Sequence, residues 1–390
     1  MRAFVLSRDQ IASTTAAIVV DELGVRFDRR VDTFTGSNWS VETPLFEGGI
    51  ELSAEEADAC RARLRRFFLA ASPTDAENSG PAFAGATLGD WAAAIERSIS
   101  RRLTAFSFVA AGDEAREHTH SADAIFADAA AAANLLYGRR RLLSLVSPHS
   151  LIGFVLSILT PNLLKAPSID ARRLPPDELK STLAFGDALV ATPSIWRYVI
   201  AQEVVAPDNT MAISFGEPMT PELSAMIRKA GFGAQREVYG STEHGLIGWR
   251  DSPSDPFALF DQWRRKGDEL ARVSPSGDVR AVVPMDILTF EGDRRFRLGG
   301  RRDGAAQIGA VNVFPAKIAA KIAEHPDVAD CVIAVSTHAG GADRLIATIR
   351  LAKPGPPTER VARSIDGWCR QRLRPHERPR IYNFTDAAAK

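Results

Sequence analysis

Residues 239–243 bring an aromatic ring, a glycine, two hydroxyls and a carboxylate together without a gap. The Tyr239 ring can stack on a base, and the Thr242 hydroxyl can bond to a phosphoryl oxygen. The Glu243 carboxylate can hold a hard divalent cation such as Mg²⁺, which prefers carboxylate and phosphate oxygens. Gly240 suits a sharp turn, because glycine adopts backbone angles closed to other residues. The same five residues are also compatible with an ordinary strand-ending turn that carries a solvated glutamate.

The segments before this turn alternate between short apolar strands and helices. Strands are predicted at 142–146, 188–191 and 211–215, and a fourth ends at Tyr239; helices are predicted at 150–160, from Pro193 and from Pro221. Such alternation is typical of a largely parallel sheet covered by helices, with ligands beyond the carboxyl ends of the strands. We therefore expect the turn after Tyr239 to lie at that edge.

The remaining segments predict two domains. Residues 1–50 read as irregular, and helices are predicted at 55–70 (with Ser53 as N-cap), 88–100 and 122–136. Hairpins are predicted over 270–300, followed by a small α+β unit with helices at 315–324 and 359–373 and strands at 331–335 and 345–351. We expect a large domain over 1–302 and a small one over 303–390, with the boundary at Asp303.

Composition indicates a soluble enzyme. A chain of 390 residues exceeds the size at which one core usually keeps growing. Lys+Arg and Asp+Glu both number 48, which argues against nucleic acid or an anionic membrane as a partner. No secretory signal is visible, the apolar run 151–159 is too short to span a membrane, and the three cysteines lack paired spacing. These features predict a cytoplasmic protein with inert thiols.

Several further motifs flank the turn in a fixed order. They are Pro148-His149-Ser150, Phe215-Gly216-Glu217-Pro218, the turn followed by His244-Gly245, Asp286, Gly300-Arg301, and the Val-Asn-Val-Phe-Pro segment at 311–315. Over about residues 105–385 this series resembles the superfamily of AMP-forming acyl- and aryl-acid ligases. The sequence of residues 311–315 is most similar to the corresponding segment of phenylacetate-type aryl-CoA ligases.

The resemblance implies a role for each matching residue. It places Tyr239 against adenine, Thr242 on the phosphate and Glu243 on Mg²⁺, and it makes Asp286 the ribose ligand and Arg301 an interdomain arginine. Gly216, Glu217, Pro218, Gly240 and Ser241 would complete the nucleotide site, while His149, Phe215, His244 and Gly245 would line the acid pocket. Asp303 would be the hinge of the small domain.

The resemblance also implies a fold and an activity. The fold is α/β, with a large N-terminal domain of helix-covered sheets and a distorted barrel, and a mobile α+β C-terminal domain. The activity is ATP- and Mg²⁺-dependent conversion of a small aryl or acyl carboxylic acid into an acyl-adenylate. The acyl group then passes to CoA or to the phosphopantetheine thiol of an acyl carrier protein.

Two departures from the family pattern open an alternative. The stretch 106–119 replaces the family's hydroxyl-rich phosphate loop but lacks its lysine, and Asp113, Glu114 and Glu117 add negative charge there. Lys390 precedes the place where the family's C-terminal Gly-Lys motif is expected. A degenerate member would bind an adenylate or a partner protein, or use preformed acyl-AMP, without making the adenylate.

His118 and His120 suggest a metal pair, but no third ligand lies at a usable spacing in the sequence. A zinc site normally needs three or four protein ligands. We therefore predict that both histidines are surface residues.

Overall fold

A computed structural model describes residues 6–69, 83–110, 116–308, 311–336, 344–353 and 359–385. These residues divide into two compact units. The first contains the described residues up to Ala110, Arg116–Val283 and Phe290–Phe296, and the second contains Pro284–Thr289 and the described residues from Arg297 onward. The division between the two units runs through the strand hairpin of residues 286–301. The hinge at Asp303 stays a prediction.

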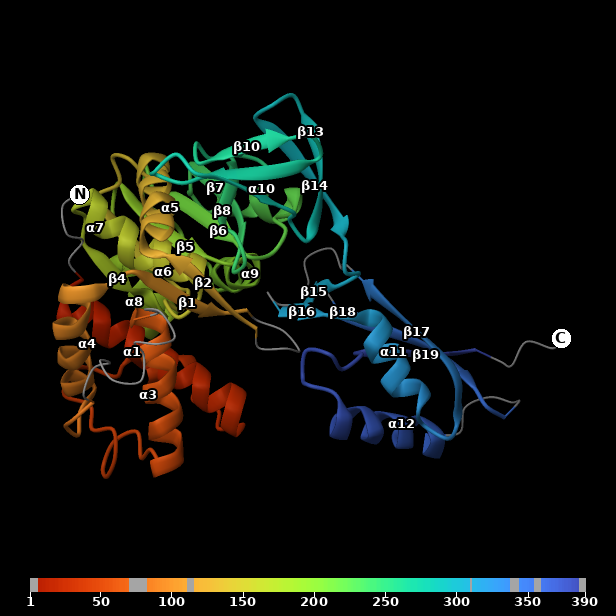
Figure 1. Ribbon diagram of the computed structural model, residues 1–390. Coiled ribbons are helices and arrows are strands. Elements are labelled where there is room, and N and C mark those ends of the chain that lie inside the picture. Colours follow the sequence, from red (N-terminus) through yellow and green to blue (C-terminus); the bar gives the residue numbers. More distant parts are fainter. Residues whose placement is uncertain are drawn as a thin grey trace. The chain divides into compact units, whose positions relative to one another are not determined.

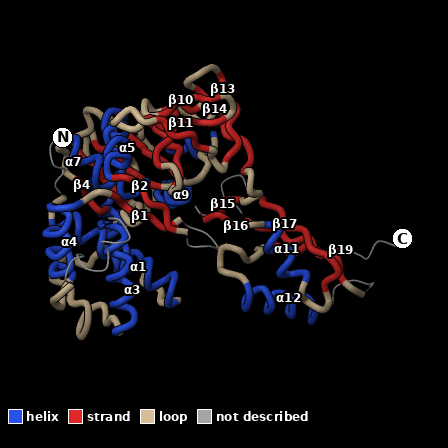
Figure 2. Tube along the Cα trace, in the orientation of Figure 1, coloured by secondary structure: helices blue, strands red, loops and turns tan. Residues whose placement is uncertain are grey.

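Helices α1 (Arg8–Phe27), α2 (Thr33–Ser37), α3 (Ala54–Leu69) and α4 (Leu88–Arg102) belong to the N-terminal part of the first unit (Figures 1 and 2). The prediction that residues 1–50 are irregular is therefore wrong. Ser7 caps α1 and forms a capping box with Gln10. Threonine and β-branched residues lower the helix propensity of α1, but burial of its apolar face at Ile11 and Ile18 outweighs that cost. Neither α1 nor another helix of the described residues has the length and hydrophobicity to cross a membrane.

One large sheet carries the candidate turn. Its strands run in the order β4 (Ser168–Asp170), β3 (Arg141–Ser144), β5 (Asp187–Ala191), β6 (Met211–Phe215), β7 (Ala234–Ser241), β8 (Gly245–Arg250), β9 (Phe257–Leu259), β14 (Arg295–Arg301) and β13 (Asp286–Glu291). Neighbouring strands from β4 to β7 are parallel, as predicted. The pairs β7–β8, β8–β9 and β9–β14 are antiparallel. The parallel arrangement therefore ends at the strand that carries Tyr239.

Two groups of helices pack on this sheet. Helices α8 (Pro176–Thr182), α9 (Pro193–Ala201) and α10 (Pro221–Lys229) enclose an apolar core with β3, β5 and β6, in which Trp196 and Ile227 are fully buried. The second group is α5 (Ala122–Leu135), α6 (Leu151–Phe154), the π-helical turn Val155–Leu159 and α7 (Thr160–Leu164). Helices α5 and α6 both contact β8, and α6 also contacts β7. The second group therefore supports the two strands that flank the turn.

Strands β1 (Ala105–Val109) and β2 (Glu117–Ser121) form an antiparallel hairpin next to α3. The rings of Phe106 and Phe108 pack on Phe67, with centroid distances of 6.2 and 5.0 Å. The stretch 106–119, which was expected to correspond to the phosphate loop, therefore lies largely within the two strands of this hairpin. Asp113 and Glu114 lie outside the described residues, as does Lys390.

A three-stranded antiparallel sheet follows the large one along the chain. It consists of β10 (Trp263–Lys266), β11 (Glu269–Val273) and β12 (Val279–Val282), in that order. Trp263 and Leu270 are fully buried on it. Strands β11 and β12 fall within the hairpins predicted over 270–300, whereas β10 was not predicted.

The second unit holds a small α+β domain. It contains β15 (Ala306–Ile308), β16 (Val311–Val313), α11 (Pro315–Ala323), β17 (Val328–Ser336), β18 (Arg344–Leu351), α12 (Glu359–Arg372) and β19 (Ile381–Thr385). Strand β18 pairs antiparallel with β17 and parallel with β19. The two helices bury Ile318, Ile322, Ile365 and Cys369 in one core with this sheet. The α+β class was predicted for this domain, although β19 was not.

The three cysteines, Cys60, Cys331 and Cys369, are free and buried. Burial raises the pKa of Cys60 to about 12 and that of Cys331 to about 11, and it also raises the pKa of Cys369. Because the thiolate is the reactive form, we expect no rapid reaction of the native protein with Ellman's reagent at pH 8. All three thiols should react after denaturation in guanidinium chloride. One equivalent reacting within seconds in the native state would contradict this expectation.

Candidate functional site

The candidate turn joins β7 to β8 as a tight antiparallel reversal. Gly240 pairs with Leu246 and Ser241 with Gly245, and a bulge lies between Tyr239 and Gly240. A Cβ on Gly240 would lie 2.4 Å from the Gly245 carbonyl oxygen, and Gly245 itself has a φ of +78°. Both glycines are therefore required by the backbone, one by close approach and the other by its left-handed conformation.

The half-buried Tyr239 ring lies on an aromatic platform. Its centroid is 5.6 Å from those of Phe257 and Phe296, at interplanar angles of 54° and 60°. These tilted contacts fix the ring orientation at the end of β7. The side chain is thus held in place before any ligand arrives.

Two histidines of β2 contact the tip of the turn. His120 Nε2 lies 2.7 Å from the Thr242 carbonyl oxygen, which can only accept, so that nitrogen carries the proton. Burial lowers the pKa of His120 to about 4, so the ring is neutral at pH 7. The predicted surface position of His120 is therefore wrong: only 9% of the residue is exposed. No group of three metal-binding side chains occurs among the described residues.

The Glu243 side chain is partly exposed. Its side chain is 30% exposed, and its Oε1 lies 4.0 Å from His118 Nε2. Carboxylate oxygens are the protein ligands that a hard cation prefers. The residue therefore fits the predicted cation ligand.

The backbone behind the tip is held by a buried ion pair that the sequence analysis missed. Asp128 of α5 and Arg272 of β11 lie 2.6 Å apart, and Asp128 is fully buried. The Leu246 N–H donates to Asp128, and Arg272 donates to the His244 carbonyl. The Ala-rich segment 122–136 carries two carboxylates, Asp123 and Asp128, and of these only Asp128 lies beyond the first helical turn and among alanines, which is the sequence signal that could have singled it out. No local sequence pattern marks its partner, Arg272, as a buried residue.

The loop after β6 carries the second set of candidate residues. Gly216 has a φ of +84°, which turns the chain directly after Phe215. Glu217 accepts a hydrogen bond of 2.6 Å from Ser194, while its Oε1 is buried without a hydrogen-bond partner among the described residues. Pro218 follows, and the Met219 N–H then donates to Glu237 of β7.

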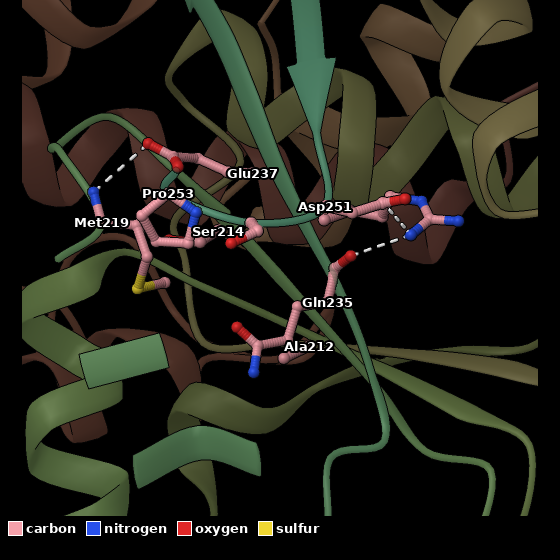
Figure 3. Close-up of a pocket in the computed structure, with 9 residues that line it drawn as sticks. Ala212, Ser214, Met219, Gln235, Glu237, Asp251 and Pro253 are labelled. Atoms are coloured by element: carbon pink, nitrogen blue, oxygen red, sulfur yellow. Dashed lines mark hydrogen bonds and ion pairs between the residues drawn. The ribbon is translucent and has the colours of Figure 1, made fainter. Parts of the chain in front are cut away.

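Glu237 therefore ties this loop to the strand that carries Tyr239. It also accepts a 2.6 Å bond from Arg250 of β8, and burial raises its pKa. Figure 3 shows the bond from Met219 to Glu237 at one end of a small cavity. Ser214 and Gln235 also line that cavity, and the Ser214 hydroxyl has no hydrogen-bond partner among the described residues. The loop 215–219 and the turn thus share one strand as their support.

His149 contacts residues of the N-terminal part. Its Nδ1 lies 2.7 Å from the Ser147 hydroxyl, and its Nε2 lies 3.5 Å from Asp21 of α1. Burial lowers the pKa of His149, although Asp21 acts in the opposite direction. Asp21 is bonded to the buried Arg63 of α3 as well. His149 thus links the segment before α6 to the N-terminal helices, and its place in an acid pocket stays a prediction.

The last three candidates lie together in the second unit. Arg301 donates from Nε and Nη2 to Asp303, at 2.9 and 2.7 Å, and its Nη1 lies 3.9 Å from Asp286. The Ala305 N–H also donates to Asp303, at 3.1 Å. Hydrogen bonding from Arg301 lowers the pKa of Asp303. The structure therefore brings the predicted ribose ligand, interdomain arginine and hinge residue into one cluster.

Gly240→Ala provides a test of the close approach in the turn. Because the added Cβ would meet a backbone oxygen at 2.4 Å, we expect a loss of about 2 kcal/mol or more in the free energy of unfolding. Gly233→Ala is the matched control, since nothing lies within 4 Å of a Cβ there, and it should change stability by less than about 0.5 kcal/mol. Chemical denaturation measures both. Equal stabilities of the two variants would refute the tight reversal.

Comparison with known proteins shows what the chain is similar to. Residues 317–390 match the AMP-binding enzyme C-terminal domain. The curated 4-coumarate–CoA ligase of Halorhodospira halophila is 29% identical over 380 residues, which cover 96% of this chain and 95% of that protein. The solved amide bond synthetase McbA from Marinactinospora thermotolerans has a TM-score of 0.54 at 17% identity, over 70% of this chain. A malonyl-CoA ligase solved with methylmalonyl-CoA and AMP also has a TM-score of 0.54, at 17% identity over 73% of this chain and 71% of that one.

The two solved structures support the fold alone, and the chain spans 63% of the length of the amide bond synthetase. The curated relative instead covers nearly the whole chain, and the domain match falls on the small α+β unit. The predicted mixed α/β class with a small C-terminal domain is confirmed. The chain is thus similar to a curated 4-coumarate–CoA ligase along nearly its whole length, and its residues 317–390 match a domain of AMP-binding enzymes.

Proposed function

We propose that this protein activates a small carboxylic acid as its acyl-adenylate and transfers the acyl group to CoA. The observation that carries the proposal is the β7–β8 turn, which holds Thr242 and the accessible Glu243 carboxylate at the end of an aromatic-backed strand. The match of residues 317–390 to the AMP-binding enzyme C-terminal domain and the curated CoA ligase relatives support the same reaction.

The reaction consists of two substitutions. In the first, a carboxylate oxygen of the acid attacks the α-phosphorus of ATP, and the bond to pyrophosphate breaks. In the second, the CoA thiol loses its proton and its sulfur attacks the acyl carbon, and AMP leaves with the electron pair of the acyl–oxygen bond. Both steps require a held nucleotide and an oriented acid.

Each candidate residue has a role in this proposal. Tyr239, Gly240 and Ser241 hold the adenine end, with Gly216, Glu217 and Pro218 beside them on the neighbouring loop. Thr242 donates to the phosphate, Asp286 binds ribose, and Arg301 donates to ribose or phosphate. Glu243 holds Mg²⁺, which offsets phosphate charge when it is bound. The ring contact of Tyr239 with Phe257 and the partial exposure of Glu243 support these two roles.

The acid is proposed to be an aryl carboxylic acid. Three curated relatives bear the name 4-coumarate–CoA ligase, and two of them are 29% and 32% identical over 96% and 53% of this chain. 4-Coumarate is therefore the first acid to test, alongside benzoate, phenylacetate and short alkyl acids. His149, Phe215, His244 and Gly245 are the proposed pocket residues. A carrier-protein thiol is the second acceptor to compare with CoA.

Glu243→Gln tests the proposed cation ligand. Because the amide carries no charge, we expect the rate of ATP-dependent acyl-AMP formation to fall on the order of 100-fold. Glu222→Gln on the exposed face of α10 is the matched control and should leave this rate unchanged. Pyrophosphate release and mass spectrometry of acyl-AMP measure the step.

The second step is measured separately with supplied 4-coumaroyl-AMP and CoA. This step needs no pyrophosphate chemistry, so Glu243→Gln should retain most of its rate. A wild-type protein that converts supplied acyl-AMP but releases no pyrophosphate with any acid would identify the non-adenylating alternative. Absence of both reactions across the acid panel would refute the proposed function.

A further inference from the structure

We infer that Asp128, Arg272 and Gln262 form a buried positioning network that sets the backbone of residues 244–246, and through it the tip of the turn, for adenylation. The inference rests on the proposed function and adds to it residues that do not touch substrate. They come from α5, from β11 and from the segment before β10. All three lie outside the motifs that define the candidate site.

Asp128 uses both carboxylate oxygens. Its Oδ2 accepts from the Leu246 N–H at 3.1 Å, and its Oδ1 accepts from Gln262 Nε2 at 2.9 Å and from Arg272 Nη2 at 2.6 Å. The residue has no exposed surface. A buried carboxylate is stable only when its acceptor sites are filled, and here one of the donors is the backbone of the turn.

Arg272 holds the same segment from the other side. Its Nη1 donates to the His244 carbonyl at 2.6 Å, and its Nη2 also donates to the Ala124 carbonyl at 2.8 Å. Its guanidinium lies over the Trp263 ring at 5.4 Å, and the Trp263 N–H donates to the Leu246 carbonyl at 2.6 Å. The backbone groups of residues 244 and 246 are therefore fixed by side chains from three different elements.

The space at Gly245 shows that the network and the turn fit each other. A Cβ there would lie 2.1 Å from Asp128 Oδ2 and 2.9 Å from Arg272 Nη1. The ion pair thus occupies the volume in which a side chain at 245 would stand. Glu243 and Thr242 lie immediately before the fixed residues, so a shift of this backbone displaces the proposed cation and phosphate ligands. A displacement of about 1 Å can cost on the order of 100-fold in rate.

A second buried pair serves as a control for purely structural effects. Asp187 is fully buried, accepts from Arg141 at 2.9 and 2.6 Å, and also accepts from the Ala184 N–H. Its chemistry matches that of Asp128, but it lies at the opposite end of the parallel strands, at the start of β5. Asp187→Asn should therefore destabilise the fold without moving the turn.

The experiment compares Asp128→Asn with Asp187→Asn, using 4-coumarate, Mg-ATP and CoA. The asparagine side chain has an NH₂ group in place of one acceptor oxygen. This group would face either the Leu246 N–H or Arg272, both of which are donors. We expect kcat for adenylation to fall about 10- to 100-fold, with the KM for CoA and the rate from supplied acyl-AMP changed less than about threefold. Asp187→Asn should lower the melting temperature by about as much as Asp128→Asn does. It should leave kcat for adenylation within about twofold of the wild-type value. Arg272→Lys should retain more activity than Arg272→Met.

Gln262→Met covers the case in which Asp128→Asn fails to fold, because it removes a single neutral donor of similar size. It should lower kcat for adenylation and leave the rate from supplied acyl-AMP unchanged. Equal kinetic losses in the Asp128 and Asp187 variants, or an unchanged kcat in Gln262→Met, would overturn the network while leaving the proposed function intact. A wild-type protein that makes no acyl-AMP would overturn the proposed function instead, and the inference with it.

Discussion

At Gly240 the backbone of β7 comes so close to the Gly245 carbonyl that no side chain fits between them. This approach reverses the chain at the point where a parallel sheet becomes antiparallel. The reversal puts hydroxyl and carboxylate side chains on a rigid hairpin rather than on a long loop, and rigid supports hold functional groups more accurately than loops do. The positions of the tip, of the Tyr239 platform and of β8 all follow from this reversal.

Two buried carboxylates stabilise the surroundings of the reversal in the same way. Glu237 bonds to Arg250 and to a backbone N–H of the 215–219 loop, and Asp128 bonds to Arg272 and to a backbone N–H of the turn. Each charge is costly to bury, and each arginine offsets only part of that cost. The backbone N–H groups add to this stabilisation, as does Gln262 at Asp128. The loop and the turn therefore contribute to keeping these carboxylates ionised within the fold.

Local patterns in the sequence were sufficient to predict most of the elements. The strand 211–215 was predicted with its observed bounds, and the helix after Ser53 begins as expected. Helix α1 was missed because its stability comes from burial rather than from propensity. The Asp128–Arg272 bond joins residues 144 positions apart, so no local pattern reveals it. The order of the motifs was enough to predict the similarity to CoA ligases that the comparisons found, whereas the roles of the individual site residues remain predictions.

Arg301 has a further consequence through its bond to Asp303. A guanidinium offers its parallel pair of N–H groups to one planar partner at a time, and Asp303 occupies Nε and Nη2. If Arg301 binds a nucleotide through that edge, Asp303 must release it and keep its backbone partners, such as the Ala305 N–H. Nucleotide binding would then loosen the backbone at residue 303, and a fixed backbone there would weaken nucleotide binding by the same free energy. Nucleotide occupancy and the mobility of the backbone at residue 303 would then be thermodynamically coupled.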